Sequence, residues 1–290
     1  MDPFDDDLVE AGPDDRYFDY CLEPYEPRRP WRGKLRAESL LWAALRIADE
    51  REWLEAPLRA VSTAVGRDLV VWGLKWDGRR IGLELYFYDP RKEDAAATMT
   101  AVGRVLEPWM KLEPQVRESI PYFMASLEPS ADAVRAGRLE AMRLYLAGER
   151  GHAGRSYRLD ASGFELENTY RFFDPRRDIE DVLALARASV FVDYGDRRVL
   201  AQVLPPELMA CRKVCIAKKR RADGVYFSGI DVEALAWFLR RHAWPGTLVE
   251  IVLRHRTRFE HVWFDVGVDV RTDATSGRIE FPKSSFYGTM

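Results

Sequence analysis

Short stretches of the chain alternate strictly between apolar residues and polar or small ones. In residues 69–76 and 81–87 every second position is apolar, and these positions hold Val70, Trp72, Leu74, Trp76, Ile81, Leu83, Leu85 and Phe87. The positions between them hold Val71, Gly73, Lys75, Gly82, Glu84 and Tyr86. A period of two places alternate side chains on opposite faces of a β-strand. We therefore predict two strands with one apolar face and one face that mixes charge with aromatic rings.

The turn between these strands, and the residues after them, occur again further along the chain. Asp77-Gly78 precedes a strand that ends at Asp89-Pro90, and 85 positions later Ser162-Gly163 precedes a stretch that ends at Asp174-Pro175. Asp-Gly and Ser-Gly pairs favour two-residue hairpin turns, and aspartate followed by proline favours a helix start. We predict equivalent hairpins over 69–88 and 157–173, each followed by a helix that its aspartate caps.

Three further hairpins follow from the same reasoning. Asp223-Gly224 is predicted as a turn between 213–219 and 225–228, Ser276-Gly277 follows a strand over 261–270, and 122–127 pairs with 139–146. Apolar residues at helical spacing predict helices near 93–107, 178–190, 231–242 (capped by Asp231) and 247–258, and another over 40–65 that bends at Pro57 and ends at Gly66. Five hairpins give ten strands that alternate with helices.

A sheet of antiparallel strands leaves two exposed edges unless it closes on itself. We therefore predict an α+β fold: a ten-stranded antiparallel β-barrel built from hairpin-plus-helix repeats, with the helices packed outside and the polar face inside. In the last hairpin Val262, Phe264, Val266, Val268 and Val270 form the apolar face, and His261, Trp263, Asp265, Gly267 and Asp269 form the other. The barrel would occupy residues 35–290 as a single domain.

Residues 1–34 are acidic and interrupted by five prolines, so they are predicted to form a tail or an arm over the body. The segment Asp14-Asp15-Arg16-Tyr17-Phe18-Asp19 is similar to the aspartate-rich magnesium motifs of some diphosphate-using enzymes. Those motifs need a helix face to aim their carboxylates, and this segment lacks helical periodicity. We interpret it as a solvated acidic tail.

Composition narrows the class of protein. With 44 basic and 47 acidic residues the net charge is −3, which argues against a nucleic-acid partner bound through a basic surface. No apolar run is long enough to cross a bilayer, and the acidic N-terminus is unlike a secretory signal, so we expect a cytoplasmic protein. Cys21, Cys211 and Cys215 are too few for a disulfide framework, and the four histidines are scattered, so no metal site is predicted.

The chain contains no nucleophile elbow, phosphate-binding loop, dinucleotide fingerprint or zinc signature. Its hairpin-and-helix plan over residues 38–290 resembles that of the ABBA, or PT-barrel, aromatic prenyltransferases. One departure is that only Gly148 to Gly154 separates the second and third hairpins, where the family would place a helix. The resemblance implies metal-independent transfer of an allylic group from a prenyl diphosphate to an aromatic acceptor, inside the barrel and without a cofactor.

In such a reaction cations hold the diphosphate, because ionisation concentrates negative charge there, and aromatic rings shield the allyl cation from water. Carried onto this chain through the strand alternation, the resemblance implies cations at Lys75, Arg143 and Lys219. It implies an aromatic shield at Tyr86, Tyr145 and Tyr226. Glu84 or Asp265 would orient the acceptor or take the ring proton.

Each of these residues also has an ordinary structural interpretation. Lys219 lies in Lys218-Lys219-Arg220-Arg221, which fits a solvated hairpin tip or a localisation signal. Tyr86 and Tyr145 could fill the barrel, and Trp72, Trp76 and Trp263 are predicted as core. The competing function is a non-catalytic barrel that binds a hydrophobic or aromatic ligand, or a protein partner.

Overall fold

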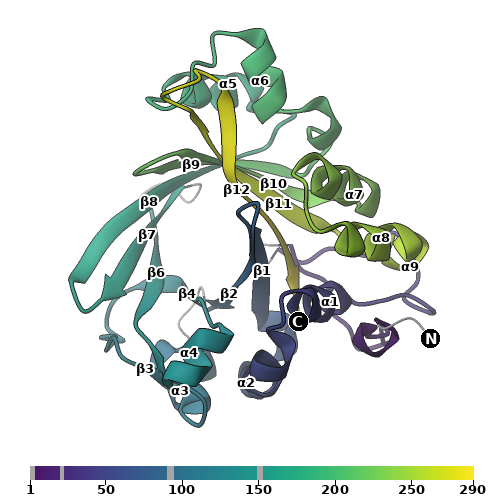
Figure 1. Ribbon diagram of the computed structural model, residues 1–290, viewed down its shortest axis with the longest axis vertical. Coiled ribbons are helices and arrows are strands. Elements are labelled where there is room, and N and C mark those ends of the chain that lie inside the picture. The colour runs from purple at the N-terminus through teal and green to yellow at the C-terminus, as the bar shows by residue number, and fades with distance from the viewer. Residues whose placement is uncertain (1–3, 20–22, 90–94, 149–152) are drawn as a thin grey trace.

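The computed structural model describes residues 4–19, 23–89, 95–148 and 153–290 and contains a closed barrel of ten strands (Figure 1). The strands are β1 (Val70–Trp76), β2 (Ile81–Tyr88), β4 (Tyr122–Leu127), β6 (Ala141–Ala147), β7 (Ala153–Asp160), β8 (Gly163–Phe173), β9 (Lys213–Lys219), β10 (Asp223–Ile230), β11 (Phe264–Thr272) and β12 (Ile279–Thr289). Each pairs with both neighbours antiparallel, and β1 closes the ring against β12 with Leu74 opposite Phe286. The predicted fold class is confirmed.

Helices cover the outside of the barrel (Figure 1). Their bounds are α1 (Glu38–Ile47), α2 (Arg51–Val65), α3 (Met99–Leu106), α4 (Ala131–Ala136), α5 (Ile179–Arg187), α6 (Arg197–Val203), α7 (Val232–Arg241), α8 (Gly246–Arg254) and α9 (Arg256–Phe259). The helices α4 and α6 were not predicted. Outside the barrel, β3 (Lys111–Leu112) and β5 (Arg138–Leu139) form a short parallel pair.

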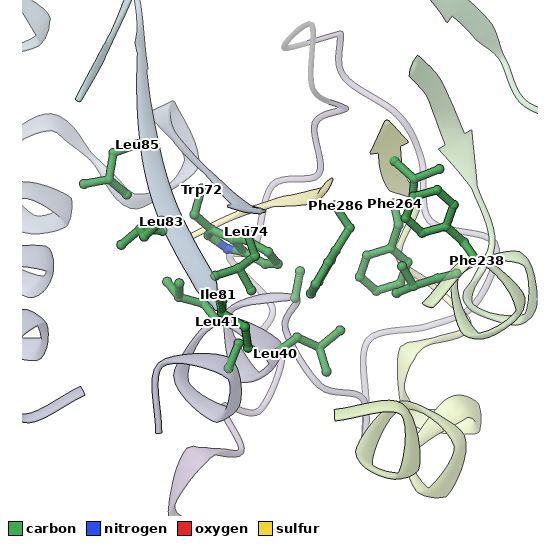
Figure 2. Packing of buried hydrophobic residues seen from close by; sticks show 14 of the residues in the cluster. Leu40, Leu41, Trp72, Leu74, Ile81, Leu83, Leu85, Phe238, Phe264 and Phe286 are labelled. Atoms are coloured by element: carbon green, nitrogen blue, oxygen red, sulfur yellow. The ribbon is translucent and has the colours of Figure 1, made fainter. Parts of the chain in front are cut away.

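The main hydrophobic core lies between the barrel wall and these helices. Figure 2 shows Leu40 and Leu41 of α1 close to Leu74 and Ile81, which come from the outward face of β1 and β2. Trp72, Phe264 and Phe286 are almost completely buried in the same layer. Each large apolar side chain contributes about 1.5–3 kcal/mol when it leaves water, so this outer layer holds the helices on the wall. The barrel interior is left for polar side chains.

Three turn and helix predictions are wrong in detail. Asp223 and Gly224 do not form the predicted turn but belong to β10, where they pair with Lys218 and Ala217. The Asp223 carboxylate is buried there and contacts the Lys218 ammonium at 3.2 Å. The 40–65 helix breaks at Asp49, which has a positive φ of 56°, whereas Pro57 lies within α2. The 247–258 helix divides into α8 and α9 at His255. The end at Gly66 is confirmed.

The helix caps were predicted correctly only in part. The Asp231 carboxylate accepts the Ala234 N–H at 2.9 Å and caps α7 as predicted. Asp174 accepts the Arg176 N–H in a turn, and α5 begins five residues further on, at Ile179, so Asp174 does not cap it. After Asp89 the residues 90–94 lie outside the described chain, and α3 is capped by Thr98 instead. Both aspartates directly follow the second strand of their hairpin.

The other connections show where the barrel departs from a regular repeat. β6 and β7 pair directly, with Ala147 opposite Gly154, so this connection is a hairpin; residues 149–152 lie outside the described part of the chain. The strand predicted over 261–270 begins at Phe264, and His261 and Trp263 precede it. The β1–β2 turn spans four residues, 77–80, and the Asp77 carboxylate accepts the N–H groups of Arg79 and Arg80 at 2.9 Å.

The N-terminal arm is packed on the body, so the interpretation of its aspartates as solvated is wrong. Asp7 is fully buried and accepts two hydrogen bonds from Arg46 at 2.8 Å. The side chain of Asp15 is 3% exposed and pairs with Arg36 and Arg67. Arginines on the body supply the countercharge that these carboxylates need once they leave water.

Candidate functional site

A cavity of about 510 Å³ opens inside one end of the barrel, in the size range of small-molecule sites. It is lined by Lys75, Glu84, Tyr86, Arg143, Tyr145, Arg158, Glu167, Asn168, Tyr170, Lys219, Arg220, Arg221, Tyr226, Asp269, Lys283 and Tyr287. Seven of the sequence-predicted residues are among them: Lys75, Glu84, Tyr86, Arg143, Tyr145, Lys219 and Tyr226. Strand alternation brings them together, because neighbouring strands in register turn matching positions to the same face.

Glu84 is the centre of one half of the cavity. Its carboxylate accepts hydrogen bonds from the Tyr86 hydroxyl at 2.7 Å and the Ser126 hydroxyl at 2.5 Å, and contacts the Lys75 ammonium at 2.5 Å. Burial by itself would raise the pKa of Glu84, but the Lys75 and Arg143 charges outweigh it and hold that pKa well below its usual range. Glu84 is therefore ionised and already hydrogen-bonded.

Arg143 joins the same network from β6. Its guanidinium contacts Glu128 at 2.9 Å and Glu167 at 2.6 Å, and approaches Glu84 at 3.5 Å. Lys75 also pairs with Glu128. Carboxylates thus balance Lys75 and Arg143 before any ligand arrives. Glu128 and Glu167 were not predicted, because Glu128 follows β4 in a loop and Glu167 is the extra residue at a bulge in β8.

The other half of the cavity carries more positive charge. The ammonium groups of Lys219 and Lys283 both contact the Asp269 carboxylate, at 2.5 and 3.1 Å, and Lys219 also donates to the Tyr226 hydroxyl at 2.8 Å. Burial, with the neighbouring Lys283 charge, lowers the pKa of Lys219 to about 8. The Lys219 side chain is only 12% exposed, so the solvated-tip interpretation holds for the exposed Arg220 but not for Lys219.

Five tyrosines from five strands form a collar around the cavity, here called the tyrosine collar. Its members are Tyr86, Tyr145, Tyr170, Tyr226 and Tyr287. Successive ring centroids lie 6.0 Å (Tyr170 to Tyr145), 6.3 Å (Tyr145 to Tyr86), 6.0 Å (Tyr86 to Tyr287) and 6.4 Å (Tyr287 to Tyr226) apart. Burial and the nearby carboxylate raise the pKa of Tyr145, which lies beside Glu84, and of Tyr226, which lies beside Asp269. These two hydroxyls are therefore neutral.

Tyr170 and Tyr287 were not predicted as members of the collar. The signal for Tyr287 was in the sequence, because Lys283, Ser285 and Tyr287 alternate along the last strand as the cavity residues do elsewhere. For Tyr170 the bulge at Glu167 shifts the alternation within β8, so counting by twos from the turn assigns the wrong face.

Asp265 lies apart from the seven residues that the cavity brings together. It lines a cavity of about 10 Å³ at the other end of the barrel, and its carboxylate accepts the Gly229 N–H at 2.9 Å. The arm covers this end, where the Trp263 N–H donates to the Tyr25 hydroxyl at 2.9 Å. Trp72 is core as predicted, whereas Trp76 is half-buried and Trp263 is half-buried under Arg28, 3.8 Å from its ring centroid.

Within the described residues no group of three side chains is arranged to hold a metal ion. Cys211 and Cys215 are buried, and Cys21 lies outside the described residues. None of the helices in the described part of the chain is long and apolar enough to span a bilayer.

No family model matches the sequence, and no curated protein matches it. Among solved structures the chain is similar to 5-dimethylallyl tryptophan synthase from Streptomyces coelicolor, determined in complex with DMASPP and Trp. The two are 11% identical, the similarity covers 86% of this chain and 92% of that chain, and the TM-score is 0.39. The predicted ten-stranded barrel is supported by the strand pairing described above.

Proposed function

We propose that this chain transfers a prenyl group from an allylic diphosphate to an aromatic acceptor inside the barrel. The observation that carries the proposal is the cavity itself: a closed wall surrounds a space lined by lysines, arginines and a collar of tyrosines. The lysines and arginines can bind the anionic part of such a ligand, and the tyrosine rings can contact its prenyl and aromatic parts. A non-catalytic ligand-binding barrel is the competing outcome.

The diphosphate belongs beside Lys219 and Lys283. These two ammonium groups share the Asp269 carboxylate, so this half of the cavity has positive charge to spare. A buried cation without full countercharge is costly, and an anionic ligand removes that cost. When the allylic C–O bond breaks, both electrons leave with pyrophosphate, and fixed cations stabilise this charge.

The tyrosine collar would shield the allyl cation. Aromatic faces attract cations by about 0.5–2 kcal/mol, and more strongly where water is excluded. Burial keeps the Tyr145 and Tyr226 phenols protonated, so these two do not compete as nucleophiles for the cation. The acceptor ring then attacks the allylic carbon and forms the C–C bond, and its proton passes to the pyrophosphate that has left.

Glu84 is the candidate partner of the acceptor, in preference to Asp265 at the far end. With its pKa held low it is a weak base, so orienting an N–H or O–H donor of the acceptor suits it better than taking the ring proton. Lys75 and Arg143 border the same space, and we assign them mainly to holding Glu84 ionised and in place.

Titration calorimetry with dimethylallyl thiolodiphosphate, with and without a chelator, tests the proposal. We expect binding that survives chelation and weakens about tenfold or more in Lys219→Ala and Lys283→Ala. The matched control is Arg240→Ala, an exposed cation on α7 outside the barrel. Binding without product from any panel of indoles and phenols would favour the non-catalytic barrel. No binding by the wild type up to millimolar ligand would end the proposal.

A further inference from the structure

Two tyrosines of the collar lie directly across from glycines on neighbouring strands. Tyr226 of β10 is opposite Gly267 of β11, and Tyr287 of β12 is opposite Gly73 of β1. Both glycines occupy inward positions of the barrel wall. A residue with a side chain at either position would point into the same space as the tyrosine ring.

The rings fill the space that a side chain would need. A methyl group at Gly267 would lie 2.2 Å from Cδ1 and 2.6 Å from Cε1 of Tyr226, and one at Gly73 would lie 2.7 Å from Cδ1 of Tyr287. Gly224 is tight in the same way, with Cε2 of Tyr226 at 2.9 Å. Non-bonded carbon atoms prefer about 3.5–4.0 Å, so no such group fits while the rings keep their positions.

Two other inward glycines, Gly154 and Gly82, do not share this constraint. Gly154 is opposite Tyr170, yet the nearest atom to a methyl group there is the Leu146 carbonyl oxygen at 3.7 Å. Gly82, opposite Lys75, has nothing within 4 Å. None of the four pairs requires a positive φ at its glycine. Space for the rings, and not backbone conformation, therefore distinguishes Gly267 and Gly73.

We infer that Gly267 and Gly73 determine specificity by letting Tyr226 and Tyr287 lie against the wall, and so set the width of the cavity for the prenyl chain. This inference rests on the proposed function for the nature of the ligand. A methyl group at Gly267 would push the Tyr226 ring off the wall, and the Tyr226 hydroxyl, now hydrogen-bonded to Lys219 at 2.8 Å, would have to move with it. The cavity would then be too narrow for a longer prenyl chain but would still accept a short one.

The first test needs no ligand. Gly267→Ala should lower the Tm by about 5 °C, and the same change made in a Tyr226→Ala background should cost almost nothing, because the clash has been removed. Gly154→Ala is the matched control and should leave the Tm nearly unchanged in either background. Equal losses with and without the Tyr226 ring would overturn the inference.

The second test compares ligand sizes. Gly267→Ala and Gly73→Ala should weaken binding of a geranyl thiolodiphosphate by about tenfold, of the dimethylallyl analogue by less, and of inorganic pyrophosphate hardly at all. Gly82→Ala should change none of them. Equal weakening at every length would overturn the specificity role. If the wild type binds no prenyl analogue the proposed function fails, and the stability cycle by itself decides whether the glycines seat the rings.

Discussion

At the residue scale, the electrostatics of the cavity divide between two neighbouring groups of charge. Lys75 and Arg143 contact three carboxylates, Glu84, Glu128 and Glu167, whereas Lys219 and Lys283 meet at Asp269. The cations Lys219 and Lys283 therefore have less countercharge than Lys75 and Arg143, and attract an anionic ligand more strongly. Lys219 is the more informative position, because burial and Lys283 bring its pKa down to about 8.

This pKa predicts how anion binding depends on pH. Lys219 carries its charge below about pH 8 and loses it as the pH rises through that value. We expect the affinity for pyrophosphate to fall between pH 7 and 9, since the neutral amine attracts the anion less. A bound anion favours the charged form, so the midpoint in the complex should lie at or above that of the free protein.

Titration calorimetry across this pH range, with Lys219→Arg as the comparison, measures the effect. The guanidinium stays protonated, so its profile should show only the titration of pyrophosphate itself. Equal slopes in the wild type and in Lys219→Arg would show that another group causes the pH dependence.

At the scale of single elements, aspartates with the same sequence context have different structural surroundings. Asp231, Asp174 and Asp89 all follow a strand and were all predicted as helix caps, but among these Asp231 has a helical N–H within reach of its carboxylate, that of Ala234. Proline after Asp174 favoured a turn, and α5 begins later. We therefore expect Asp231 and Asp174 to contribute unequally to the free energy of unfolding.

Asp231→Ala should lower the free energy of unfolding by about 1 kcal/mol through loss of the α7 cap. Asp174→Ala removes a hydrogen bond in an exposed turn, so its effect should be clearly smaller. Urea unfolding of both variants and the wild type, compared at equal m-value, provides the measurement. A loss at Asp174 that equals the loss at Asp231 would contradict the assignment.

At the scale of the whole molecule, the arm and the barrel depend on each other through buried ion pairs. Arg36, just after the arm, contacts Asp15 from the arm and the Met290 carbonyl at the end of the chain. Asp7 pairs with Arg46 and Arg51 on the first two helices. Arg36 thus connects the arm to the C-terminal residue, at the end of the barrel that the arm covers.

Removing residues 1–34 should therefore destabilise the barrel domain that we predict over 35–290. Breaking a buried ion pair costs up to about 3–5 kcal/mol, and Arg36 would lose Asp15 while it keeps Glu38 at 3.4 Å. We expect Asp15→Asn to reproduce much of the decrease in urea midpoint, and Glu26→Gln, at an exposed arm position, to have no effect. A truncated chain as stable as the full chain would restore the interpretation of this segment as a solvated tail.

The sequence by itself determined the strands, most of their turns and the side of the wall that most strand residues face. Hydrophobic alternation is a local property with a period of two, and it placed Lys75, Glu84 and Tyr86 inside and Trp72 outside. The same reasoning predicted barrel closure, because ten strands otherwise leave two edges unpaired. This was enough to identify seven of the sixteen residues that line the cavity.

Only the tertiary structure decided which inward residues share one cavity. Alternation gives the face of a strand but not the height along the barrel axis, so Asp265 and Asp269 looked equivalent in the sequence although only Asp269 lines the cavity of the candidate site. Register between distant strands brought Glu128 and Glu167 to Arg143, and a bulge turned Tyr170 inward. Charge balance depends on these long-range contacts, and no local pattern encodes them.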